Sequence, residues 1–377
     1  METAKAGYGT FCPMKNKHRE PTRRAVLAAS AGLVALPVQA AARRIVTVAG
    51  TGVQGFALDG ESVKTAKLDQ PYGVLVGPDG ALYWADFGSN RVLRLQSGKV
   101  FAVAGTGEKG HAGDDGPPLK ALLSAPHEVR FDSKANMLIA ERDAHVVRFI
   151  DRKSGHISTL VGTGLPGFSG DSGPSNAAQL KQPHSIALDR QDNLYICDIQ
   201  NNRVRKRDGA SGILTTFAGN GDTADTPEEA PLSAPLHGPR SIDIAPDGTL
   251  YLILREGNKV YSIDPARKLL KHIAGTGAKG YGGDGGPALN STWNGPKGIV
   301  YAPDHSLYIS DTENHVIRRV SLIDGTVSTV AGTGARGDGP EGDPRACALA
   351  RPHGVCIHDG TLYIGDSENY RIRALRL

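Results

Sequence analysis

Residues 298–334 read GIVYAPDHSLYISDTENHVIRRVSLIDGTVSTVAGTG, and this segment contains four short runs rich in β-branched residues. The runs are Gly298–Ala302, Leu307–Ser310, Val316–Val320 and Val327–Val330. Turn-forming residues separate them, such as Pro303-Asp304 and Asp324-Gly325. Short β-branched runs bounded by Pro, Asp, Asn and Gly are typical of antiparallel strands joined by tight turns. The segment therefore predicts a sheet of four antiparallel strands.

The same pattern occurs six times along the chain. An Ala-Gly-Thr-Gly-like step begins at Ala49, Ala104, Val161, Ala218, Ala274 and Ala331. A proline keeps the same spacing and stands at Pro71, Pro126, Pro183, Pro239, Pro296 and Pro352. Repeats of this length are typical of propellers and solenoids, and four antiparallel strands per repeat favour a propeller. We therefore expect an all-β fold, a six-bladed β-propeller of four-stranded blades.

The two ends of the repeated region predict how the ring closes. Ile45–Ala49 matches the fourth strand of the other repeats, whereas Arg371–Leu377 matches a third strand. We expect the N-terminal strand to complete the last blade, which leaves no open sheet edge there. Residues 41–377 then form one closed domain of six repeats, although the length alone would suggest two or three domains.

Two further segments resemble the NHL repeat. After a Leu-Tyr-Ile-x-Asp run, the chain continues as Asn202-Arg203-Val204 in one repeat and as Asn314-His315-Val316 in another. The order Ala-Gly-Thr-Gly, Gly-Asp-Gly-Gly-Pro and Leu-x-x-Pro-x-Gly is also similar to that family, over residues 45–377. The resemblance implies the propeller fold. It implies no single function, because NHL propellers include RNA-binding proteins, sensor domains, scaffolds and lyases.

Composition and charge narrow the class of protein. The chain of 377 residues contains 48 glycines and 23 prolines, too many for a helical bundle, and no strict Gly-X-Y period of collagen. Hydrophobic residues make up 39%, enough to bury a core. The formal charge of +4 equals the basic excess of residues 1–24, so the rest of the chain is neutral. Aromatic residues make up only 6% of the chain. Because nucleic-acid binding relies on positive charge and aromatic stacking, we expect no nucleic acid as a partner.

Residues 1–40 resemble a bacterial twin-arginine export signal. Arg23 and Arg24 precede the apolar stretch Ala25–Leu36, and Val38-Gln39-Ala40 has the small residues of a cleavage site. The stretch is too short to span a bilayer. We therefore expect a periplasmic or secreted monomer that begins near Ala41 and is not inserted in the membrane after cleavage.

One position of the repeat carries residues that differ from blade to blade. It directly follows the repeated proline and holds Tyr72, His127, His184, Arg240, Lys297 and His353. Because each innermost strand starts at this position, we expect the six side chains at the mouth of the central channel. A second ring ends the second strands, at Asp86, Glu141, Asp198, Leu254, Asp311 and Asp366. We expect both rings in one polar pocket that binds a small polar or anionic molecule.

These residues suggest a chemistry for the pocket. Three neutral imidazoles, from His127, His184 and His353, are a ligand set for a divalent metal, most readily Zn²⁺. Such a metal would support a lyase or hydrolase reaction. The candidate catalytic residues are Tyr72, Glu141, Arg240, Arg255 and Lys297. Arg255, like its neighbour Glu256, belongs to the fourth repeat, which departs most from the pattern.

The three histidines also resemble those at the metal-bearing mouth of the peptidyl-hydroxyglycine amidating lyase, an NHL-like propeller. They fall in repeats 2, 3 and 6, which differs from an even spacing around one ion. Two alternatives stay open. The carboxylate ring could hold the histidines in a closed polar lid without a ligand, or the mouth could be a non-catalytic surface that binds a ligand, glycan or protein.

Three cysteines lie beyond residue 40: Cys197, Cys347 and Cys356. A disulfide between Cys347 and Cys356 suits an oxidising compartment, and free buried thiols are the alternative.

Overall fold

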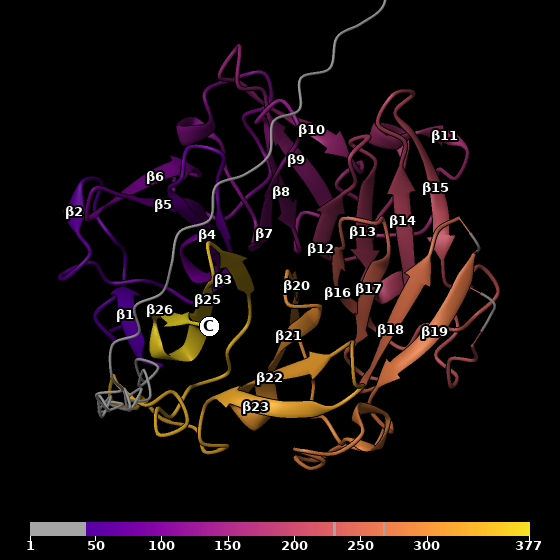
Figure 1. Cartoon of the computed structure of the whole chain (residues 1–377). Helices are drawn as coiled ribbons and strands as arrows, with labels where there is room; N and C mark the ends of the chain where they lie inside the picture. The colour runs from indigo at the N-terminus through magenta and orange to yellow at the C-terminus, as the bar shows by residue number, and fades with distance from the viewer. Residues whose placement is uncertain (1–42, 229–230, 267) are drawn as a thin grey trace, which may run out of the picture. The chain divides into compact units, whose positions relative to one another are not determined.

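The repeats fold into six antiparallel sheets, the blades, arranged around a central axis (Figure 1). The structure is a computed structural model that describes residues 43–228, 231–266 and 268–377. The predicted export signal at 1–40 therefore lies outside the described residues. Within the described part, no helix is long and apolar enough to cross a membrane. The predicted six-bladed β-propeller is confirmed.

In blades 1 to 5 the four main strands run from the innermost to the outermost in chain order. Blade 1 consists of β3 (Pro71–Val76), β4 (Leu82–Asp86), β5 (Arg91–Gln96) and β6 (Lys99–Ala104), with β2 (Glu61–Ser62) at its outer edge. Blade 2 consists of β7 (Pro126–Phe131), β8 (Met137–Glu141), β9 (Val146–Ile150) and β10 (Ile157–Val161). Blade 3 consists of β12 (Pro183–Leu188), β13 (Leu194–Asp198), β14 (Arg203–Arg207) and β15 (Ile213–Ala218), with β11 (Gly173–Pro174) outside.

The second half of the ring repeats this order. Blade 4 consists of β16 (Pro239–Ile244), β17 (Leu250–Leu254), β18 (Lys259–Asp264) and β19 (Leu269–Ala274). Blade 5 consists of β20 (Gly298–Ala302), β21 (Ser306–Asp311), β22 (Val316–Ser321) and β23 (Val327–Ala331). Blade 6 consists of β24 (Val355–His358), β25 (Thr361–Asp366), β26 (Arg371–Arg376) and β1 (Ile45–Ala49).

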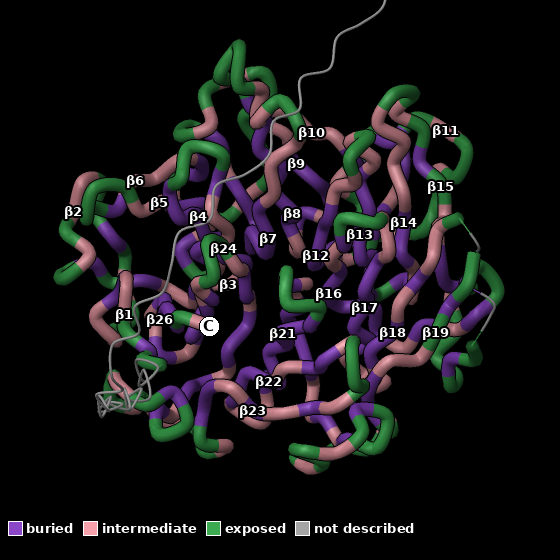
Figure 2. Tube along the Cα trace, viewed as in Figure 1, coloured by how far each residue is buried: buried purple, intermediate pink, exposed green. Residues whose placement is uncertain are grey.

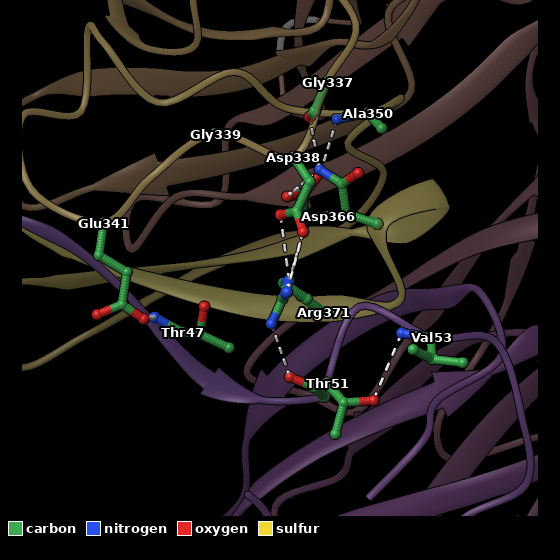
Figure 3. A network of polar contacts seen from close by, with 12 residues as sticks. Thr47, Thr51, Val53, Gly337, Asp338, Gly339, Glu341, Ala350, Asp366 and Arg371 are labelled. Atoms are coloured by element: carbon green, nitrogen blue, oxygen red, sulfur yellow. Dashed lines mark hydrogen bonds and ion pairs between the residues drawn. The ribbon is translucent and has the colours of Figure 1, made fainter. Parts of the chain in front are cut away.

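Blade 6 joins the two ends of the propeller, as the sequence predicted. Strand β1 pairs antiparallel with β26, and Ile45 lies opposite Leu375. The loop before blade 6 adds polar contacts, because Asp338 forms an ion pair with Arg371 at 2.9 Å and Glu341 accepts the N–H of Thr47 at 2.8 Å (Figure 3). These contacts tie the N-terminal strand into a blade whose other strands come from the opposite end of the chain.

Apolar side chains fill the space between neighbouring blades. Figure 2 shows that the strands nearest the axis are largely buried, whereas the outer loops are exposed. The largest buried apolar side chains are Trp84 and Trp293, both fully enclosed. Each blade presents one face to the blade before it and one to the blade after it, so almost every position of the second strands is buried.

The carboxylates that end the second strands lie inside the blades, so the expectation that they face the basic ring at the mouth is wrong. Asp311 is fully buried and accepts the N–H of Asn294 at 2.8 Å. Its other oxygen lies 3.6 Å from the guanidinium of Arg318, on the next strand of the same blade. Blades 2, 3 and 6 repeat this pairing, with the partners Glu141–Arg148, Asp198–Arg205 and Asp366–Arg373. In these four blades the buried arginine therefore determines where the carboxylate points, whereas Asp86 of blade 1 has Leu93 at the arginine position and accepts the N–H of Asp69.

The cysteines form no disulfide in the described residues, which agrees with the alternative of free buried thiols. Cys197, Cys347 and Cys356 are all buried free thiols, and burial raises the pKa of each. They pack as small apolar side chains in the cores between blades.

Candidate functional site

The residue after each repeated proline lies at the mouth of the channel, as the repeat alignment predicted. In every blade a residue with positive φ precedes the proline, and this turn directs the next side chain toward the axis. These residues are Gln70, Ala125, Gln182, Gly238, Gly295 and Arg351. Four of the six are not glycine, so the repeat keeps a strained conformation at this point.

The side chains at the mouth contact one another across blades. The rings of Tyr72 and His353 stack at 3.8 Å and 7°. His127 packs edge-on against Tyr72 at 5.0 Å and against His184 at 4.6 Å between ring centroids. Arg240 reaches His127, with 2.9 Å between Nη2 and Nε2. The structure thus brings together the residues that the sequence placed at separate blades.

Each of the three histidines has one defined tautomer. Nδ1 of His184 lies 2.7 Å from the carbonyl of Gln182, and Nδ1 of His353 lies 3.3 Å from the carbonyl of Arg351. A carbonyl can only accept, so both rings carry their proton on Nδ1 and leave Nε2 as an acceptor. His127 accepts the Arg240 N–H at Nε2, which gives it the same tautomer. Burial, with the nearby positive charges, holds the pKa of all three well below the ordinary value, so the rings are neutral.

Arg240 is a buried cation without an anionic partner. Only 6% of the residue is exposed, its one hydrogen bond goes to the neutral His127, and its Nε has no partner. The nearest acid of its blade, Glu256, pairs with Arg255. Burial lowers the pKa of Arg240 to about 9, and Arg255 adds to the effect. Within the described residues, no carboxylate forms an ion pair with this guanidinium.

Lys297 and Arg351, at the start of blades 5 and 6, share one carboxylate. Glu313 lies 2.9 Å from Nζ of Lys297 and 2.7 Å from Nη2 of Arg351. Burial lowers the pKa of Lys297 to about 7, and the Arg240 charge acts in the same direction. Burial opposes the ionisation of Glu313, but hydrogen bonds from Arg351 and Lys297 bring its pKa to about 2. Glu313 is therefore an anion throughout the neutral range.

These side chains line a pocket of about 550 Å³. Its walls include Tyr72, His184, Arg240, Lys297 and His353 from the predicted ring. Arg255 and Glu256 of blade 4 also line it, where the sequence departs most from the repeat. His127 lies just below, in a much smaller cavity beside Tyr72 and His353. Glu141 does not line the pocket, because it is buried against Arg148.

The sequence analysis missed two arginines of the pocket wall, Arg142 and Arg351. Each lies directly beside a repeat position that marked the predicted pocket, the carboxylate that ends a second strand or the repeated proline. Arg142 follows the second strand in blade 2, as Arg255 does in blade 4, whereas Arg351 precedes the repeated proline of blade 6. Comparing these two neighbouring positions across the six repeats would have identified both.

The histidines do not form a ready metal site in this arrangement. Within the parts of the chain that the structure describes, no group of three or more His, Cys, Asp or Glu side chains has metal-binding geometry. Nε2 of His127 already accepts from a cationic guanidinium, which would repel a divalent ion. Its ring centroid is 6.1 Å from that of His353. The donor set therefore fits an anion better than a Zn²⁺ ion, and the three-histidine metal site stays a prediction.

Comparisons with known proteins agree with the fold. The NHL repeat family matches residues 349–375, in blade 6. The chain is 25% identical over 289 residues to Protein SUPPRESSOR OF QUENCHING 1, chloroplastic, of Arabidopsis thaliana, covering 74% of this chain and 27% of that protein. It is 24% identical over 355 residues to NHL repeat-containing protein 2 of Gallus gallus, covering 86% and 48%. The chain thus spans about half or less of the length of these curated relatives.

A solved structure with the same architecture is an auxiliary nutrient binding protein from Bacteroides ovatus. It superposes with a TM-score of 0.66 at 18% identity, over 89% of this chain and 76% of that one. At this identity the likeness concerns the fold alone. These matches show a similarity to NHL-repeat proteins, and the closed ring of six sheets shows that the chain is a six-bladed β-propeller.

Proposed function

We propose that this propeller binds a small anion in the pocket at the mouth of its channel. The observation that carries the proposal is Arg240, a buried guanidinium whose only hydrogen-bond partner among the described residues is a neutral histidine. A buried charge without a partner costs several kcal/mol, and a bound carboxylate or phosphate would offset that cost with two parallel hydrogen bonds. Arg142, Arg255, Lys297 and Arg351 in the same wall add positive potential.

Isothermal titration calorimetry with acetate, sulfate and phosphate tests this function. We expect at least one of these anions to bind, and the Arg240→Met variant to lose about 30-fold or more in affinity, as removing one partner of a buried charge pair does. Arg319→Met is the matched control, since it also removes one positive charge but lies on β22 with its side chain 30% exposed, away from the pocket. If no anion binds, or if both variants weaken binding equally, the proposal is wrong.

Catalysis is the second candidate. Lys297 has a pKa of about 7 and lines the pocket, so it could take up or release a proton at neutral pH, as a lyase or hydrolase requires. The metal-assisted form of this idea predicts a divalent ion in the protein as purified, bound through His127, His184 and His353. Metal analysis of the purified protein, repeated after His184→Ala, separates the two forms. Absence of a stoichiometric metal leaves only proton transfer by Lys297.

A non-catalytic binding protein is the alternative, and the name of the Bacteroides ovatus structure is compatible with it. Export to the periplasm or outside the cell and a monomeric state also remain predictions. Replacing Arg23 and Arg24 by lysine and fractionating the cells tests the twin-arginine route. Unchanged export of the folded protein would contradict it.

A further inference from the structure

Two acceptor atoms of buried histidines in the pocket wall have no donor within the described residues. Nε2 of His184 and Nε2 of His353 are unprotonated, because Nδ1 of each ring donates to a backbone carbonyl. The two residues are only 4% and 5% exposed, yet both line the pocket. Each ring is held in place, His353 by the Tyr72 stack and His184 by its edge-on contact with His127. The pocket therefore offers two fixed acceptors that only a bound molecule or water can satisfy.

The ligand group that donates to these acceptors has to be neutral. Five cationic side chains line the same pocket: Arg142, Arg240, Arg255, Lys297 and Arg351. An ammonium donor would be repelled by them, and a simple anion such as acetate or sulfate carries no proton to donate. A hydroxyl group is a neutral donor that also accepts.

Each of these two acceptors has a cationic donor on a neighbouring blade, an arrangement that suits hydroxyl groups. His184 of blade 3 stands beside the donor Arg240 of blade 4, and His353 of blade 6 stands beside the donor Lys297 of blade 5. A hydroxyl between such neighbours can donate to the histidine and accept from the cation. An amide N–H can only donate, so it would satisfy one of the two.

We propose that the ligand is a polyhydroxylated carboxylate, the chemical class of the sugar acids. Its carboxylate pairs with Arg240, and its hydroxyl groups donate to Nε2 of His184 and of His353. This inference rests on the anion-binding function proposed above and adds the class of molecule. A pocket of about 550 Å³ holds a molecule of this size.

Calorimetry with matched probes tests the proposal. D-gluconate and hexanoate both have six carbons and one carboxylate, but only gluconate carries hydroxyl groups. We expect gluconate to bind at least tenfold more tightly than hexanoate, since several hydrogen bonds each contribute a few-fold. Sorbitol, which has the hydroxyls without the carboxylate, should bind far more weakly than gluconate. N-acetylglycine is the probe for an amide-bearing acid.

The histidine variants locate the effect. His184→Phe and His353→Phe keep an aromatic ring and remove the acceptor, so each should weaken gluconate binding about three- to tenfold and hexanoate binding by a smaller factor. Circular dichroism shows whether each variant is folded. If a variant does not fold, the comparison of gluconate with hexanoate on the unaltered protein still tests whether hydroxyl groups contribute to binding.

The outcomes separate this inference from the function on which it rests. Equal affinities for gluconate and hexanoate would overturn the hydroxyl inference and leave anion binding intact. Tighter binding of N-acetylglycine than of gluconate would also overturn it. Failure of every carboxylate, of sulfate and of phosphate to bind, or binding of sorbitol as tight as that of gluconate, would refute the anion-binding function itself.

Discussion

Buried arginines occur in two regions of this propeller, and their surroundings are opposite. Inside blade 5, Arg318 is fully buried and lies 3.0 Å from Asp284 and 3.6 Å from Asp311. Two carbonyl oxygens, of Gly282 and Thr292, accept further hydrogen bonds from it at 2.8 Å each. At the mouth, Arg240 is almost as buried and has one neutral partner.

The difference separates a structural role from a binding role. The charge of Arg318 is balanced by two carboxylates, and two carbonyls add hydrogen bonds, although its Nε, like that of Arg240, has no partner within the described residues. The charge of Arg240 has no anion in the free protein, so a ligand that supplies one would stabilise it. Four experiments test this distinction.

The largest effect is expected inside the blade. Arg318→Met leaves Asp284 and the buried Asp311 without their cation, so the free energy of unfolding should fall by about 3–5 kcal/mol. Urea denaturation measures this loss. Arg319→Met on the same strand is the control and should cost less than about 1 kcal/mol, because its pair with Asp304 is solvent-exposed. Equal losses for the two variants would show that the buried cluster contributes no more to stability than an exposed ion pair.

Blade 4 lacks the buried pair and allows the reverse experiment. Leu254 and Tyr261 stand where blades 2, 3, 5 and 6 have a carboxylate and an arginine. Leu254→Asp places a carboxylate in an apolar site and should cost about 2–4 kcal/mol. Adding Tyr261→Arg should recover about 1–3 kcal/mol of that loss. A double-mutant cycle by urea denaturation measures the recovery, and a coupling of zero would contradict the structural role of the pair.

At the mouth, removing the arginine should change the free energy of unfolding in the opposite direction. Arg240→Met replaces an unmatched buried charge by an apolar chain, so without ligand the free energy of unfolding should rise by about 1–2 kcal/mol. Denaturation in an anion-free buffer measures the rise. Saturating ligand should reverse the order, because only the unaltered protein gains the binding free energy. Destabilisation of the free protein by this change would place Arg240 with the structural arginines.

The smallest effect concerns pH. Lys297 has a pKa of about 7, well below its ordinary value, because it is buried beside other cations. It loses its charge as pH rises through 7, so anion affinity should fall about three- to tenfold between pH 6 and 8.5. Glu313, with a pKa of about 2, stays ionised over this range, and the three histidines stay neutral.

Calorimetry at the two pH values, with Lys297→Met as the comparison, measures this dependence. The variant has no charge to lose, so its affinity should be nearly constant. A pH dependence that persists in the variant would assign the titration to another group. The free energy of unfolding should depend on pH in the opposite direction to anion affinity. Between pH 7 and the ordinary pKa of lysine, the unfolded chain binds more protons than the folded protein. Lys297 therefore makes the free energy of unfolding rise with pH.

Much of the fold could be predicted from the sequence, because each blade repeats its turns at the same places. The prolines from Pro71 to Pro352 marked the start of each innermost strand, and Ile45–Ala49 was identified as the missing strand of blade 6. The same alignment placed His127, His184, Arg240 and the other members of the ring at one mouth. Repeat position is enough for this step, since equivalent backbone atoms of a closed ring surround one axis.

The direction of the side chains could not be predicted in the same way. Glu141 and its equivalents end their strands at the mouth, but they turn into the blade toward an arginine on the neighbouring strand. The pairing of Arg255 with Glu256, which leaves Arg240 without an anion, likewise depends on two cations competing for one carboxylate. Such competition is decided by distances between strands rather than by the spacing of residues along one strand.

The sequence by itself thus determined the number of blades, their strands, the closure of the ring and the six residues of the mouth. All of these follow from local turn chemistry repeated at a constant interval. Only the tertiary structure decided which charges neutralise each other, which tautomer each histidine adopts and which acceptors stay open. Those properties depend on burial and on contacts between blades, where water no longer screens a charge and each polar atom needs a partner.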